Sequence, residues 1–173
     1  MRKDTSRWRA GAAVALGGML ATGMLSTANA KGPKVANILE FGSMVGVPDA
    51  MTGTKAPIRG INGGGIPWTI ASGVGELKAG GHLEVAVNGL VLAAGPSAGS
   101  NPITAFRAIV SCLTSDNTIV NVTTAPFPAT TGPAASGGGD AFIEADVVLP
   151  QPCIAPLIFV TSPGGAWFAT VGN

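Results

Sequence analysis

The sequence predicts an all-β protein: an antiparallel β-sandwich of about seven or eight short strands, preceded by a signal peptide. Three observations predict this fold. Apolar and polar residues alternate with a period of two in several segments, which is typical of strands with one buried face. Glycine and proline, 26 and 13 of the 173 residues, interrupt every candidate helical run. Charged residues make up only 11% of the chain, too few for the outer faces of long amphipathic helices.

Residues 1–30 have the three-part pattern of a signal peptide. The segment 1–9 is basic, the segment 10–25 is uncharged and mostly apolar, and Ala28-Asn29-Ala30 supplies small residues, so we expect cleavage after Ala30. The alternative is a retained membrane anchor, but a bilayer span needs about 20 apolar residues and four glycines dilute this run. The sequence thus predicts a secreted, extracellular protein, or a periplasmic one in a cell with two membranes, without a membrane span after cleavage.

The remainder, 31–173, is expected to be one domain with its own hydrophobic core. It keeps six basic and eight acidic residues, a net charge of −2. Nucleic-acid binding normally needs a clustered basic surface, whereas the basic residues here are scattered. We therefore exclude nucleic acid as a partner.

The first part of this domain is expected to contain a hairpin. A short strand over 36–41 leads into a long loop over 42–65. Alternation begins in 66–78, around a glycine break, and is most regular in 82–92. Since glycines at 80–81 separate these two segments, we expect them to pair as antiparallel strands.

The second part is expected to contain two further hairpins. Turn-forming residues at 114–117 and 162–165 separate alternating segments of similar length. In chain order we expect a hairpin of 103–113 and 118–124, a loop over 126–139, a strand over 141–149, and a hairpin of 156–161 and 167–171.

Cys112 and Cys153 are the only two cysteines of the chain. An exported protein meets an oxidising compartment, so we expect one disulfide that joins two strand ends. The Cα atoms must then lie within about 7 Å of each other. The alternative is two separate buried thiols, because cysteine is also a common core residue.

His82 is the only histidine, and by parity it faces outward together with Glu84. We interpret it as a surface residue. The alternative is a catalytic histidine, but the chain has no Gly-x-Ser-x-Gly elbow that would supply a nucleophile. One histidine and two paired cysteines leave zinc and copper short of ligands, so we expect no metal and no cofactor.

Asp140, Glu144 and Asp146 share one face of a predicted strand by parity. Carboxylate oxygens are ligands of calcium, so a calcium site is one interpretation of this group. Neighbouring residues on one strand face are, however, about 7 Å apart, too far to chelate without further oxygens. We therefore interpret them as a solvated face that discourages aggregation.

Trp68 and Trp167 are the candidate ligand-binding residues, since exposed aromatic rings offer flat faces for stacking on sugars. Both tryptophans also alternate with apolar residues, Trp68 with Ile66 and Ile70, and Trp167 with Ala169. That pattern is equally that of core packing.

Two segments carry a resemblance. GELKAGGHLEVAVNGLVL at 75–92 and APLIFVTSPGGAWFATV at 155–171 resemble an uncharacterised group of small secreted bacterial β-sandwich proteins with no assigned activity. The first segment is also similar to the repeated hairpin of chordin-type extracellular domains. The resemblance implies an extracellular β-domain and assigns no functional residue.

These observations favour a non-catalytic extracellular or envelope-associated β-sandwich with a binding or structural role and a partner in the cell envelope or outside the cell. The second hypothesis is a small-molecule or glycan-binding module that uses Trp68 or Trp167. The third is an enzyme that acts through His82 or through carboxylates such as Glu76 and Glu84.

Overall fold

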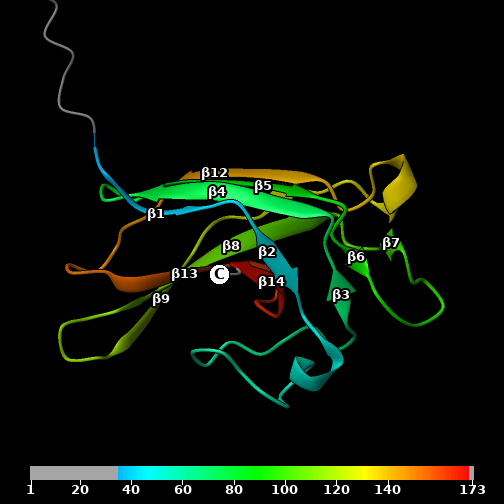
Figure 1. Cartoon of the computed structure of the whole chain (residues 1–173), viewed down its shortest axis with the longest axis horizontal. Helices are drawn as coiled ribbons and strands as arrows, with labels where there is room; N and C mark the ends of the chain where they lie inside the picture. The colour runs from blue at the N-terminus through cyan, green and yellow to red at the C-terminus, as the bar shows by residue number, and fades with distance from the viewer. Residues whose placement is uncertain (1–34, 172–173) are drawn as a thin grey trace, which may run out of the picture. The chain divides into compact units, whose positions relative to one another are not determined.

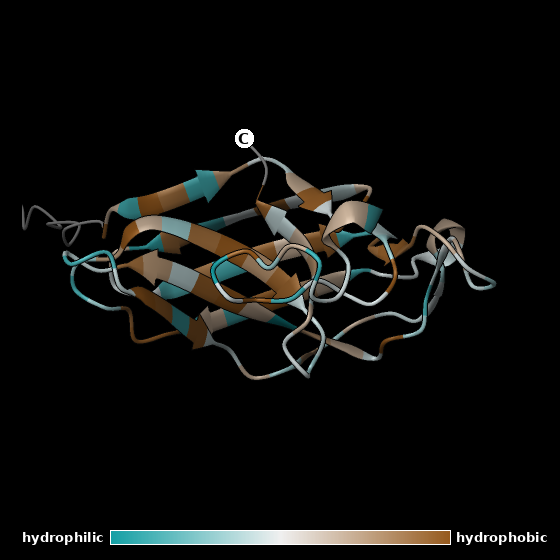
Figure 2. Cartoon of the chain, turned by 90° about the horizontal axis from the view of Figure 1, so that it is seen from below, coloured by the Kyte–Doolittle hydropathy of each residue, from teal (hydrophilic) through white to brown (hydrophobic). Residues whose placement is uncertain are grey.

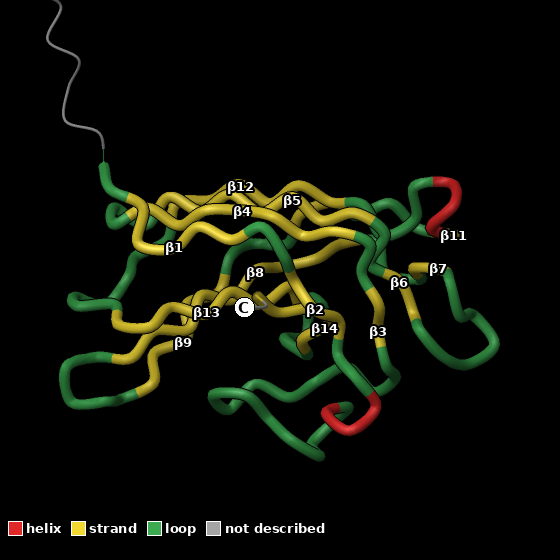
Figure 3. Tube along the Cα trace, in the orientation of Figure 1, coloured by secondary structure: helices red, strands yellow, loops and turns green. Residues whose placement is uncertain are grey.

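The computed structural model describes residues 35–171, so the predicted signal peptide at 1–30 lies outside the described residues. The described part is all-β, and its only helical segments are two short 3-10 turns, η1 (Asp49–Met51) and η2 (Ala134–Ser136) (Figure 3). No helix in residues 35–171 has the length and apolar character needed to cross a membrane. The predicted fold class is confirmed: two antiparallel sheets lie one above the other (Figure 1).

The first layer is a four-stranded sheet with the order β1-β4-β5-β12. Its central pair, β4 and β5, is the predicted hairpin, and the turn between them contains Gly81 with a φ of 91°. β12 comes from much later in the chain and pairs with the other edge of β5. The strands are β1 (Asn37–Phe41), β4 (Ser72–Lys78), β5 (His82–Asn88) and β12 (Ala141–Asp146).

The second layer is a six-stranded sheet with the order β10-β8-β13-β14-β2, in which β9 also pairs with β8. It contains the two other predicted hairpins, β8–β9 and β13–β14. The strands are β2 (Met44–Gly46), β8 (Ala105–Leu113), β9 (Ile119–Thr123), β10 (Phe127–Pro128), β13 (Ile154–Thr161) and β14 (Trp167–Val171).

Two pairs of very short strands complete the described fold. They are β3 (Trp68–Thr69) with β6 (Val91–Leu92), and β7 (Ser100–Asn101) with β11 (Gly132–Pro133). The described part has fourteen strands, of which eight are at least five residues long. The predicted seven or eight strands correspond to these longer ones.

The two predicted loops contain more regular structure than expected. β2 and η1 lie within 42–65, and β10, β11 and η2 lie within 126–139. Each short strand pairs with a segment distant in sequence, as β2 does with β14, so local alternation gives no sign of it. The loop that follows η1 packs against β8 and β9: Arg59 donates to the carbonyl oxygen of Ser111 at 2.8 Å, and Asn121 donates to the carbonyl oxygen of Arg59 at 3.1 Å.

One continuous core includes residues from both sheets. Hydrophobic residues, brown in Figure 2, occur along strands throughout the described fold. In the four-stranded sheet one face is buried, and the alternate residues form an outer face that is open to solvent. The predicted buried face of β8, which contains Phe106 and Cys112, is fully buried as expected. The buried face of the four-stranded sheet comprises Leu77, Leu83, Val85, Val87 and Ile143.

The expected disulfide is present. Cys112, near the end of β8, is bonded to Cys153, just before β13, and their Cα atoms are 5.0 Å apart. Because β8 and β13 are adjacent antiparallel strands, the bond joins neighbours within one sheet. It therefore links the β8–β9 hairpin covalently to the β13–β14 hairpin.

Candidate functional site

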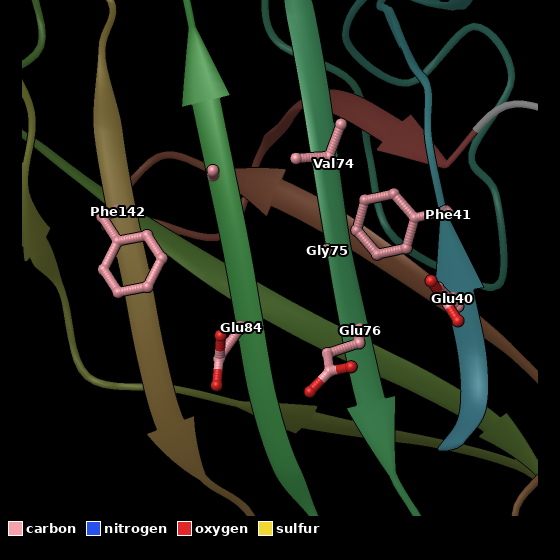
Figure 4. Close-up of a pocket in the computed structure, with 8 residues that line it drawn as sticks. Glu40, Phe41, Val74, Gly75, Glu76, Glu84 and Phe142 are labelled. Atoms are coloured by element: carbon pink, nitrogen blue, oxygen red, sulfur yellow. The ribbon is translucent and has the colours of Figure 1, made fainter.

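Four glutamates, one from each strand, form a row across the outer face of the four-stranded sheet. Glu40 lies opposite Glu76, Glu76 opposite Glu84, and Glu84 opposite Glu144. Figure 4 shows the first three of these side chains on adjacent strands. We call these four residues the glutamate row. Like charges placed directly opposite each other destabilise a sheet, so packing of the fold does not require this arrangement.

Two basic residues adjoin the glutamate row, fewer than its four carboxylates. Lys78 forms an ion pair with Glu76 at 2.9 Å, and Asn37 also donates to that carboxylate at 2.9 Å. The hydrogen bond from Lys78, followed by that from Asn37, lowers the pKa of Glu76. The other basic residue is His82.

His82 contacts a carboxylate with each of its ring nitrogens. Nδ1 lies 2.9 Å from Asp146 Oδ1, and Nε2 lies 2.9 Å from Glu84 Oε1. Asp146 is directly opposite His82 in the β5–β12 register. The hydrogen bonds to Glu84 and then to Asp146 raise the pKa of the imidazole above its ordinary value. His82 thus faces outward beside Glu84, as parity indicates.

His82, Glu84 and Glu144 also bring three potential metal-ligand atoms together. One donor atom from each residue lies within 4.8 Å of the other two. Sequence parity groups only residues of one strand, and neighbouring side chains on one strand face are about 7 Å apart. It therefore gives no indication of a group that side chains from two strands form. Side chains directly opposite on adjacent strands are closer, about 4.5–5.5 Å between Cβ atoms, and it is the β5–β12 pairing that assembles the three residues.

Asp140 does not join this group. It precedes β12, and its Oδ1 accepts a hydrogen bond from the backbone N–H of Gly89 at 2.8 Å. The three predicted carboxylates therefore divide: Glu144 and Asp146 lie near His82, and Asp140 ties the start of β12 to the chain after β5.

Three members of the glutamate row, Glu40, Glu76 and Glu84, help to line an open hollow of about 320 Å³ on the same sheet. Two apolar side chains on its lining are exposed, Phe142 by 54% and Val74 by 44%. Figure 4 shows the ring of Phe142 on β12, close to the strand that carries Glu84. The hollow is lined by Glu40, Phe41, Val74, Gly75, Glu76, Glu84, Ala86 and Phe142. The surface thus combines carboxylates with apolar side chains.

Both candidate tryptophans lie in the core, with exposed fractions of 5% for Trp68 and 1% for Trp167. Trp68 stacks on Phe168 with ring centroids 4.0 Å apart, and the Phe106 ring lies beside this pair, nearly perpendicular to both rings. Trp167 packs against Phe159. This burial disfavours the hypothesis that either ring is a ligand platform, since neither offers an exposed face for stacking. The alternation of both tryptophans with apolar residues indicates a core position, and the structure places them there.

Comparisons with protein-family models, with curated proteins and with solved structures found no match to this chain.

Proposed function

We propose that the protein is exported and acts outside the cytoplasm as a non-catalytic β-sandwich that binds a partner through the outer face of its four-stranded sheet. The signal-peptide pattern of 1–30 supports export, and so does the disulfide, since disulfides persist mainly in oxidising compartments. The partner is a basic segment of an envelope or extracellular protein, in which lysine or arginine alternates with apolar side chains.

The observation that carries this proposal is the glutamate row beside exposed apolar side chains. Five of the eight acidic residues in 35–171 lie on this one face, beside the two basic residues Lys78 and His82. Opposed like charges cost stability, which a positively charged partner would recover. Val74 and Phe142 could contact the apolar side chains of the same segment.

The enzyme hypothesis receives less support from this geometry. Both ring nitrogens of His82 face carboxylates. A Ser-His-Asp mechanism instead needs a hydroxyl nucleophile on one of them. The arrangement is better suited to holding a cation than to acyl transfer.

A labelled peptide of alternating lysine and phenylalanine, measured by fluorescence anisotropy with EDTA present, tests the binding proposal. We expect the double variant Glu40→Gln/Glu76→Gln to bind it about threefold to tenfold more weakly, since exposed charge pairs contribute up to about 1 kcal/mol each. The matched control, Asp49→Asn/Asp116→Asn, removes the same charge elsewhere and should bind like the unmodified protein. Equal losses in the two double variants would show a general charge effect and reject the proposed face.

A further inference from the structure

We propose that His82, Glu84 and Glu144 bind one divalent transition-metal ion, with Zn²⁺ as the best fit, on the outer face of the four-stranded sheet. The donor atoms are Nε2 of the imidazole and one oxygen of each carboxylate. The proposal goes beyond the function above, because a metal site requires no protein partner.

The contacts of His82 call for a cation on the imidazole ring, because each ring nitrogen faces a carboxylate oxygen at 2.9 Å. A neutral imidazole has one N–H, and its other nitrogen presents a lone pair. With Nδ1–H donating to Asp146, a lone pair on Nε2 would face Glu84 Oε1 at 2.9 Å, which is repulsive. Either a proton or a metal ion between these two atoms removes the repulsion. The Nδ1–Asp146 contact is also the one that metal-binding histidines usually make with their second nitrogen.

Glu144 supplies the third donor. It lies directly opposite Glu84 in the register, and its side chain is exposed. Among residues 35–171 it makes no side-chain hydrogen bond or ion pair, so both of its oxygens are free to turn toward an ion. All three ligands stand on paired strands, which hold such a group more firmly than loops do.

The donor set favours zinc over calcium. Zn²⁺ accepts imidazole nitrogen and carboxylate oxygen at about 2.0–2.2 Å, and a site with three protein ligands leaves its fourth position to water. Two such bonds at a tetrahedral angle place the donor atoms about 3.3–3.6 Å apart. The donor atoms of this group lie within 4.8 Å of one another, so the exposed Glu144 side chain has to rotate toward His82 and Glu84 to complete the site. Ca²⁺ takes about 6–8 oxygen ligands, which this face does not supply. An open hollow of about 400 Å³, which His82, Glu144 and Asp146 help to line, gives solvent and the ion access.

The test is titration of the purified protein, prepared without a histidine tag, with ZnCl₂. Calorimetry should give one Zn²⁺ per chain. Because His82 is the only histidine, its imidazole resonances are unique, and Nε2 should shift as the site fills. A calorimetric signal without a shift at His82, or CaCl₂ shifting His82 as strongly as ZnCl₂ does, would overturn the proposal. This measurement needs no variant and is therefore independent of any folding defect.

Three variants locate the ion. His82→Gln should weaken Zn²⁺ binding by more than about 100-fold, because loss of a neighbour that only orients a ligand already costs about 10–100-fold. Asp146→Asn should fall within that smaller range. Glu40→Gln removes a charge of the same row two strands away and should change the affinity by less than about threefold, since salt screens exposed charges about 10 Å apart. If Glu40→Gln weakens binding as much as His82→Gln, the ion is only accumulated by net charge and the site is rejected. The peptide assay above contains EDTA, so the two proposals can fail separately.

Discussion

Hydrogen bonds from two threonine hydroxyls stabilise the ionised carboxylate of Asp116. It lies in the turn between β8 and β9, where its carboxylate accepts hydrogen bonds from the hydroxyls of Thr114 and Thr118. The hydrogen bond from Thr114, followed by that from Thr118, lowers the pKa of Asp116. These bonds favour the ionised form, so the folded state holds this carboxylate charged at a pH where the unfolded chain begins to take up a proton.

The lowered pKa has a consequence for stability. A depressed folded pKa contributes stability that is fully present above the unfolded value, about 3.9, and is lost as the pH falls through the folded pKa. We expect unmodified protein to be more stable than Asp116→Asn above pH ~5, with the difference narrowing below pH ~3.9. Urea denaturation of both proteins across this range measures it. A difference that does not change with pH would contradict the assignment.

Trp68 and Phe142 are large aromatic residues with opposite environments, 5% and 54% exposed. Because Trp68 packs within an aromatic cluster, Trp68→Ala should lower the free energy of unfolding by about 3–5 kcal/mol. Phe142→Ala, the matched control, should cost less than about 1 kcal/mol, as is usual for surface substitutions. Urea denaturation monitored by circular dichroism compares them. Similar losses would mean that Phe142 is a core residue and not part of a binding face.

At the scale of elements, the close approach of β1, β4 and β5 depends on Gly75. A Cβ atom at this position would lie 2.2 Å from the carbonyl oxygen of Glu84 and 2.7 Å from the ring of Phe41. Overpacking of this kind costs about 1–3 kcal/mol, so Gly75→Ala should lower the free energy of unfolding by that amount. Gly42→Ala is the control, because a Cβ atom on Gly42 would meet nothing within 4 Å and its φ is not in the left-handed region. Equal urea midpoints for the two variants would be inconsistent with this close approach.

The sequence predicts local elements well and distant pairings poorly. The three hairpins were expected, because each joins alternating segments across a short turn and all of that information is local. The pairing of β12 with β5 is between segments far apart in the chain, and alternation does not specify which strands become neighbours. The outward direction of His82 and Glu84 was therefore predictable, whereas their approach to Glu144 and Asp146 was not.

At the scale of the whole described fold, the disulfide constrains the chain covalently between two hairpins. Cys112 and Cys153 are 41 residues apart in sequence, and the bond joins adjacent strands of the six-stranded sheet. Closing a loop of this length reduces the entropy of the unfolded chain, an effect worth roughly 3–4 kcal/mol. The bond therefore stabilises the sandwich mainly by acting on the unfolded state.

Removing both sulfurs tests this argument. Cys112→Ala/Cys153→Ala should lower the free energy of unfolding by about 3–4 kcal/mol, and the urea m value should rise because the unfolded chain is less compact. Cys112→Ser/Cys153→Ala should be less stable still, since Cys112 is fully buried and a hydroxyl there costs free energy unless it finds a hydrogen-bond partner. Titration of free thiols in the denatured, unreduced protein is the independent check. It should find none, and two reactive thiols per chain would show that the disulfide does not form.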